Sequence, residues 1–135
     1  MNVARPVRII ATISALVAVA LGMGTYTHAK FTSIHMLFGL VVALALLILA
    51  VMAVFTSGLG RLGAMGVVYA FIVPIFGVTQ QMILVGDLHW LVERAHLAVG
   101  FGAVAFIGTI SARLMRPKKQ AARQVSAQPQ PQAVR

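Results

Sequence analysis

The chain has 135 residues, of which 60% are hydrophobic and only 10% are charged, and its mean hydropathy is +0.95. Soluble domains average about 45–50% apolar and about 25% charged residues, so this composition excludes a water-soluble globule, because so short a chain could not hide this much apolar surface. Eleven Lys and Arg against two Asp and Glu give a net charge of +9. The basic residues flank apolar runs or lie in the C-terminal tail without interleaved aromatic residues, which argues for membrane topology and against nucleic-acid binding. The absence of cysteine excludes disulfides and thiolate-based metal sites.

In chain order, four segments are long and apolar enough to cross a bilayer, which requires about 20 residues per helix. They cover residues 7–25, 32–55, 62–85 and 88–115, and Pro74 is expected to kink the third. The segment 56–61, TSGLGR, predicts a tight turn between the second and third spans. We therefore expect an all-α membrane protein: an antiparallel bundle of four transmembrane helices in one domain, residues 1–116.

The distribution of Lys and Arg predicts how the bundle is oriented. Most of them flank one side: Arg5, Arg8, Arg61, Arg113, Arg116, Lys118, Lys119 and Arg123. Lys30 and Arg94 lie toward the other side, near the two acids, Asp87 and Glu93. Both termini should thus face the cytoplasm, with the protein integral to the cell membrane and residues 117–135 forming a disordered basic tail. The first span also resembles a secretory signal ending near Thr27-His28-Ala29, but we expect it to be retained.

The histidines carry the strongest functional pattern in the chain. All four lie at span ends predicted to be outside the cytoplasm: His28, His35, His89 and His96. The pattern His-x6-His-x3-Gly occurs twice, ending at Gly39 and Gly100, with a constant offset of 61 residues. This repetition favours a tandem repeat of two helix hairpins related by a pseudo-twofold axis along the membrane normal.

Helical geometry gives the pattern a chemical meaning, because residues four apart lie on one face. His35 shares a face with Gly39, as His96 does with Gly100. If both faces point inward, the two imidazoles approach each other, and the glycines leave room for a flat macrocycle, as bis-histidine haem binding requires. Interfacial histidines and packing glycines are the plainer alternative. The matched pairs favour ligation of haem b iron by His35 and His96, because an ionisable residue within a span usually faces the interior with a partner.

Four further polar residues are weaker candidates for the same site. His28 and His89 lie two turns closer to water, where they could bond haem propionates or hold a second metal, although an interfacial role is favoured. Glu93 precedes His96 by three residues and could orient a histidine, shuttle a proton, balance the iron charge or form a salt bridge at the rim. Gln80, next to Gln81, is a candidate hydrogen-bond donor to a propionate or a quinone.

Two of these segments resemble the heme A synthase family. Residues 32–40, TSIHMLFGL, are similar to the start of the second helix in one half of that family, and residues 95–100, AHLAVG, to its fourth; the Gln80 region resembles its third. The resemblance covers most of residues 1–115 and implies a four-helix haem-binding half with His35 and His96 as ligands. The family's acid precedes the second-helix histidine, where this chain has Thr32, so the resemblance extends to haem ligation and not to oxidation of a substrate haem.

The resulting functional expectation is a b-type cytochrome that carries single electrons near the outer membrane face, with a quinone or redox protein as partner, rather than a stand-alone enzyme. Three alternatives stay open. One is a quinone- or superoxide-linked or haem-modifying oxidoreductase, and another is a cofactor-free accessory or assembly subunit of a respiratory or photosynthetic complex. The third is a copper protein that uses Met23 or Met36 with the histidines. A homodimer and a larger membrane complex are both compatible with the sequence.

Overall fold

The computed structural model describes residues 3–25 and 31–116, and this part of the chain is helical without any strand. Four of its helices are long and apolar enough to cross a membrane, which confirms that part of the fold prediction. The elements are α1 (Ala4–Thr25), α2 (Thr32–Val54), α3 (Gly60–Thr79), the short 3₁₀ helix η1 (Gln80–Met82) and α4 (His89–Met115). His28 and the predicted tail, residues 117–135, lie outside the described residues.

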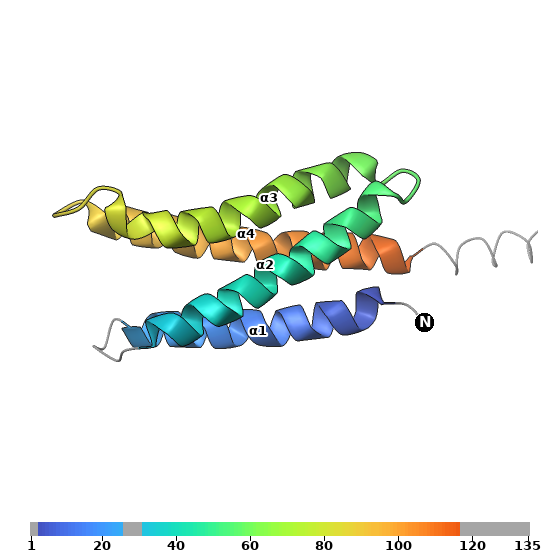
Figure 1. The fold of residues 1–135 in the computed structure, drawn as a ribbon. Coiled ribbons are helices and arrows are strands. Elements are labelled where there is room, and N and C mark those ends of the chain that lie inside the picture. Colours follow the sequence, from blue (N-terminus) through green and yellow to red (C-terminus); the bar gives the residue numbers. More distant parts are fainter. Residues whose placement is uncertain (1–2, 26–30, 117–135) are drawn as a thin grey trace, which may run out of the picture.

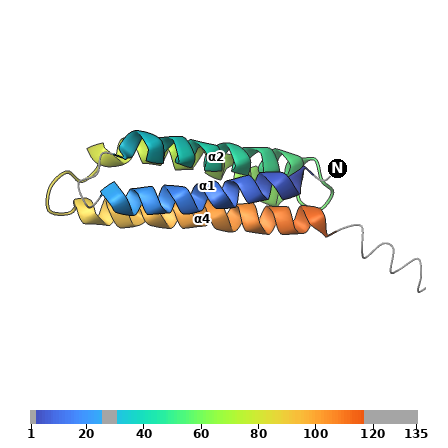
Figure 2. The ribbon, with the colours of Figure 1, turned by 90° about the horizontal axis from the view of Figure 1, so that it is seen from below.

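Successive helices run in opposite directions, and α2 takes an oblique course across the bundle (Figure 1). Its N-terminal end lies beside α1 and its C-terminal end beside α3. Seen from below, α1 runs alongside α4 (Figure 2). Within the described residues α1 and α3 do not contact each other. Helices α2 and α4 contact one another, and each of them also contacts both α1 and α3.

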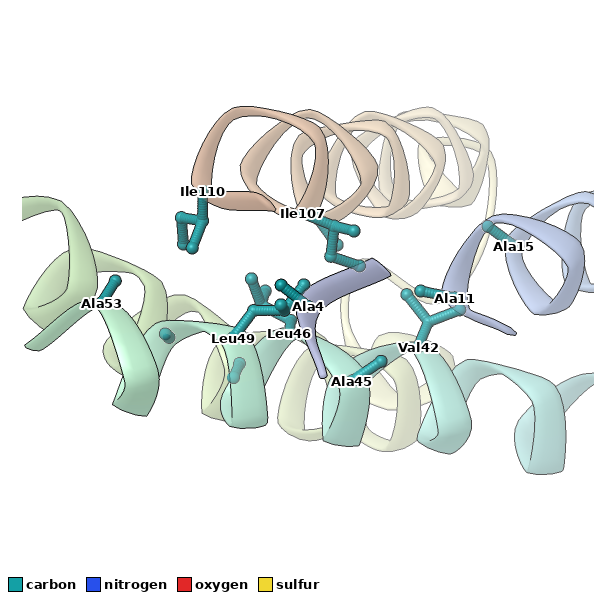
Figure 3. Packing of buried hydrophobic residues seen from close by; sticks show 13 residues of the cluster. Ala4, Ala11, Ala15, Val42, Ala45, Leu46, Leu49, Ala53, Ile107 and Ile110 are labelled. Atoms are coloured by element: carbon teal, nitrogen blue, oxygen red, sulfur yellow. The ribbon is translucent and has the colours of Figure 1, made fainter. Parts of the chain in front are cut away.

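The buried core consists mainly of small side chains (Figure 3). It lies toward the end of the bundle where α1 begins and α2 and α4 end. Ile107 and Ile110 of α4 point toward Leu46 and Leu49 of α2, and Leu46, Leu49 and Ile110 are fully buried. Val42 and alanines from α1, α2, α3 and α4 complete this cluster: Ala4, Ala11, Ala15, Ala45, Ala50, Ala53, Ala70 and Ala103. Since lipid gives helices no hydrophobic reason to associate, small residues that allow close van der Waals contact stabilise such a bundle. The tightly packed half is therefore the one remote from the N-terminal ends of α2 and α4.

The closest approach between helices joins α2 to α3. A Cβ atom added at Gly63 would meet backbone atoms of α2, the nitrogen of Val54 and, at 2.7 Å, the oxygen of Ala50. One added at Gly66 would lie 2.9 Å from both Ala50 Cβ and Ile110 Cδ1. The turn that precedes α3 uses Gly58 at φ +79°, a left-handed conformation that favours glycine. The tight turn predicted at 56–61 therefore delivers α3 directly against α2.

The third predicted span ends earlier than expected. It was predicted to reach residue 85, whereas α3 ends at Thr79 and η1 at Met82. Ile83 is already extended, and positive φ angles at Leu84 and Gly86 turn the chain into α4. The physical reason is the short connection: the chain must reverse between Met82 and His89, so residues that are apolar enough for a span form the turn instead.

The α2–α3 contact generates a stability prediction. Gly63→Ala should destabilise the protein by about 1–3 kcal/mol, the usual cost of overpacking, because the new methyl group would press on backbone that cannot rotate away. Thermal unfolding in detergent, followed by circular dichroism, measures the change. Gly108→Ala is the matched control, since no described atom lies within 4 Å of its added Cβ, and it should match or slightly exceed the wild-type stability. Equal unfolding temperatures for the two variants would contradict the packing argument.

Candidate functional site

A cavity of about 480 Å³ lies toward the other end of the bundle, where α1 ends and α2 and α4 begin. All four helices and η1 contribute to its wall. Small-molecule and cofactor sites typically enclose about 300–1,000 Å³, so this cavity has the capacity of such a site. Its deeper wall is apolar, with Val42, Val73 and Val104, whereas its rim carries amide, carboxylate, imidazole and guanidinium groups.

Two histidines from different helices meet in the wall of this cavity. His35 lies in the first turn of α2 and His96 in the second turn of α4. Their ring centroids are 5.9 Å apart, and the ring planes are inclined by 54°. Both side chains are half-buried and line the cavity. The structure thus brings together the two residues that the sequence pattern singled out as a pair.

His35 is held by the backbone of α1. Its Nδ1 lies 2.8 Å from the carbonyl oxygen of Ala18, so Nδ1–H donates and the carbonyl accepts. This hydrogen bond selects the tautomer in which Nε2 keeps its lone pair, the arrangement common among metal-binding histidines. Gly22, one turn farther along α1, backs the ring: an added Cβ would lie 3.1 Å from Cε1 and 3.3 Å from Nδ1. The ring of His35 therefore has a defined position and a defined acceptor nitrogen.

His96 is held differently, by ring packing. It stacks on Phe76 of α3 with centroids 6.1 Å apart and planes inclined by only 21°. Gly77 lies beside the His96 ring, and a Cβ atom added at Gly77 would lie 3.6 Å from Cε1 of His96. Its buried Nδ1 has no hydrogen-bond partner among the described residues. A buried polar atom without a partner costs about 1–3 kcal/mol, so ring packing, and not a hydrogen bond at Nδ1, holds His96 within the described residues.

The two predicted glycines differ in their relation to the cavity. Gly100, one turn from His96, lines the cavity, and no described atom lies within 4 Å of a Cβ added there. Gly39, one turn from His35, has equally open surroundings but is not part of the cavity wall. Only the α4 glycine is therefore placed to leave room for a cavity ligand.

The remaining predicted residues gather at the rim. Gln80 and Gln81 reach the cavity from η1, and Glu93 reaches it from α4, one turn before His96. His89, the first residue of α4, also lines the cavity, and its Nδ1 lies 3.3 Å from the carbonyl oxygen of Ile83. The rim thus combines hydrogen-bonding groups with one carboxylate at the polar end of an apolar cavity.

A cation also lies at this rim. The guanidinium carbon of Arg94 lies 5.2 Å from the centroid of the Trp90 ring, a cation–π contact that holds the arginine on the outer turn of α4. Arg94 lines the cavity. From the sequence, Arg94 is expected on the outer side of the membrane and as a candidate salt-bridge partner of Glu93, so its place in the cavity wall is an addition from the structure.

The sequence analysis missed the residues that support the two histidines. Gly22 and Gly77 occur in the first and third spans, and a glycine inside an apolar helix indicates close approach by a neighbour. Phe76 carries no sequence sign of stacking on a histidine. The carbonyl of Ala18 belongs to the backbone, so no residue type could have announced it.

Tyr69 fixes α3 against α4 close to the histidine pair. Its hydroxyl donates to the carbonyl oxygen of Val99, 3.0 Å away, and Val99 lines the cavity. The same hydroxyl occupies the space where a side chain at Gly102 would begin. The ring also packs on Phe106, with centroids 5.0 Å apart. Tyr69 and Gly102 therefore form one interlocking contact.

Ligand donors in the described part of the chain are few. It contains no group of three or more His, Cys, Asp or Glu side chains arranged to hold a metal ion. The chain matches no known protein-family model, and no curated protein or solved structure is significantly similar to it. The fold therefore indicates only the broad class of the protein. Its described part is helical with four helices of membrane-spanning length, as in a multi-pass membrane protein.

The Tyr69–Gly102 contact predicts a measurable coupling. Gly102→Ala should destabilise the bundle by about 1–3 kcal/mol through overpacking, and Tyr69→Phe should cost about 0.5–1.5 kcal/mol through the lost hydrogen bond. In a Tyr69→Leu background, Gly102→Ala should cost much less, because the ring and hydroxyl that obstruct the new methyl group are gone. Thermal unfolding of the wild type, Gly102→Ala, Tyr69→Leu and the double variant tests this expectation as a double-mutant cycle. Additive effects would show that the two residues do not interlock.

Proposed function

We propose that the protein is a membrane b-type cytochrome that binds haem b through His35 and His96 and carries single electrons. The observation that carries this proposal is the separation of 5.9 Å between two imidazole centroids in one cavity. Imidazole nitrogens bind a metal ion such as zinc at about 2.0–2.1 Å, so two imidazoles that would hold one ion between them must lie within a few ångströms of each other. The observed separation accords with such a pair.

The small number of donors favours haem over a bare ion. A structural or catalytic zinc site takes three or four protein ligands, and the described residues offer no such group. A porphyrin brings its own four nitrogens, so the protein needs to supply only the two axial positions. When bound, haem supplies an iron that gains and loses one electron at a potential set by its axial ligands and surroundings.

The residues around the cavity fit the shape and polarity of haem b. The Nδ1–H of His35 donates to Ala18, which orients the ring and increases the basicity of Nε2. The apolar part of the wall would suit the hydrocarbon faces of the porphyrin ring. Gln80, His89 and Arg94 at the rim offer hydrogen bonds and one positive charge to the carboxylates at one edge of the porphyrin. Glu93 beside them could instead accept or deliver a proton.

The membrane setting of the proposal follows from charge. With the basic ends of the spans in the cytoplasm, the rim lies near the outer face of the cell membrane, within reach of a quinone or a redox protein. The proposed role is electron transfer rather than stand-alone catalysis. A haem-modifying or quinone-linked oxidoreductase would use the same cavity with Glu93 as proton partner, and Glu93→Gln would then abolish turnover while the haem spectrum is kept.

The visible spectrum of the protein tests the proposal. Purified in mild detergent, the wild type should show a sharp reduced α-band and a pyridine haemochrome of haem b. His35→Ala and His96→Ala should each lose most of the haem while keeping their helical circular dichroism, because each removes an axial ligand and no core residue. His89→Ala removes a proposed rim hydrogen bond and no proposed iron ligand, so it should retain most of the haem and lose less affinity than either ligand variant.

A colourless and well-folded protein, still colourless after incubation with haem, would overturn the proposal. The cofactor-free accessory subunit would then be the better hypothesis, and co-purification with larger membrane subunits would be the next measurement. Full haem retention in both His35→Ala and His96→Ala would also overturn the assignment of the ligands.

A further inference from the structure

The two proposed haem ligands are supported in different ways, and the difference lies in the helix that precedes each of them. Ala18 and Gly22 are four residues apart and therefore share one face of α1. Both act on His35: the Ala18 carbonyl accepts the Nδ1 proton at 2.8 Å, and Gly22 leaves room for the ring beside it. The Nδ1 of His96 has no such partner among the described residues.

We propose that Gly22 is a positioning residue, which allows the Ala18 carbonyl to hold His35 with Nε2 ready to bind, whereas His96 is the ligand that adjusts. This inference rests on the proposed haem function and adds the origin of one ligand's geometry. It makes α1 a functional part of the site, although α1 itself provides no ligand.

The spacing at Gly22 is the basis of this assignment. An added Cβ would lie 3.1 Å from Cε1 and 3.3 Å from Nδ1 of His35, closer than ordinary van der Waals contact. The intruding methyl group would therefore press on the edge of the ring that carries the donating nitrogen. The ring would have to move away from α1 by a few tenths of an ångström, and the hydrogen bond of 2.8 Å to Ala18 would lengthen and weaken. Glycine is the residue that permits the bond.

The corresponding glycine at the second histidine does not have this role. An added Cβ at Gly77 would lie 3.6 Å from Cε1 of His96, which is an ordinary contact. No hydrogen bond to the backbone is at risk there, because the Nδ1 of His96 is unpartnered within the described residues. Stacking on Phe76 restrains the plane of the ring, but no hydrogen bond among the described residues fixes its Nδ1. Gly77→Ala is therefore a matched control, with the same change beside the other ligand.

A fixed and an adjustable ligand together make physical sense. A ligand held in its binding tautomer before the cofactor arrives avoids the ordering cost at the moment of binding. Removing such an outer-shell partner in metal sites typically weakens binding by about 10–100-fold. The second ligand then closes the site by a small movement. Helix α1 thus sets where the cofactor lies, and α4 adapts to it.

The first test uses the protein without haem, so that it does not depend on the cofactor. Nitrogen NMR of protein labelled with ¹⁵N-histidine in detergent micelles distinguishes the two neutral tautomers, and His35→Gln identifies the His35 signals. The wild type should show Nδ1 protonated and Nε2 unprotonated at His35. Gly22→Ala should shift His35 to a mixture of tautomers, and Gly77→Ala should leave it unchanged. A merely structural role for Gly22 would not move the tautomer.

The second test measures haem affinity for the same proteins. Gly22→Ala should weaken haem binding by about 10–100-fold and Gly22→Val more, with unchanged helical content, whereas Gly77→Ala should bind like the wild type. A wild-type His35 protonated at Nε2 would overturn the inference even if a variant failed to fold. Equal His35 tautomers and equal haem affinities in the wild type and Gly22→Ala would also overturn the inference. In that case, haem binding by the wild type would leave the proposed function intact. If the wild type bound no haem, the proposed function would fail, and the NMR result would then decide only how His35 is held.

Discussion

Close contact between α2 and α3 at Gly63 and Gly66 determines how the other elements can lie. It draws the C-terminal half of α2 toward α3, while the hydrogen bond from His35 to Ala18 ties its N-terminal end to α1. The helix therefore crosses the bundle obliquely (Figure 1). In lipid, where apolar side chains gain nothing by leaving their surroundings, such backbone-level contacts are the main source of helix association. The tight core forms where α2 meets α3 and α4, and the cavity lies toward the opposite end.

The cavity concentrates the polar chemistry of a mostly apolar chain. An imidazole inside a helix bundle is costly unless it has partners. The two rings meet this requirement unequally: His35 is hydrogen-bonded to the backbone, whereas His96 stacks on Phe76 and its Nδ1 has no hydrogen-bond partner in the described part of the chain. This inequality connects the proposed function with the further inference: His35 is already held with Nε2 as its acceptor nitrogen, whereas no hydrogen bond among the described residues fixes Nδ1 of His96.

The proposed cytochrome and its alternatives share one arrangement of residues. An electron carrier needs two axial ligands, an apolar cavity and a rim that fits carboxylates, whereas an oxidoreductase needs in addition a proton partner such as Glu93. The likeness to one half of heme A synthase expected from the sequence concerns residues 32–40, at the beginning of α2, and 95–100, from the second turn of α4 onward, which contain His35 and His96. The haem proposal therefore depends on His35 and His96 both in the sequence and in the cavity.

The sequence by itself determined the four apolar helices, because membrane-spanning length and hydropathy are local properties, and its repeated histidine pattern singled out His35 and His96. It could not fix the end of α3, since residues 83–85 are apolar enough for a helix but are needed for the turn. Gly39 and Gly100 look equivalent in the sequence, yet only Gly100 borders the cavity. The tertiary structure alone decided which helix face meets which, and with it the contacts of His35 with Ala18 and of His96 with Phe76. These contacts depend on helix crossing and on backbone carbonyls, which no residue type encodes.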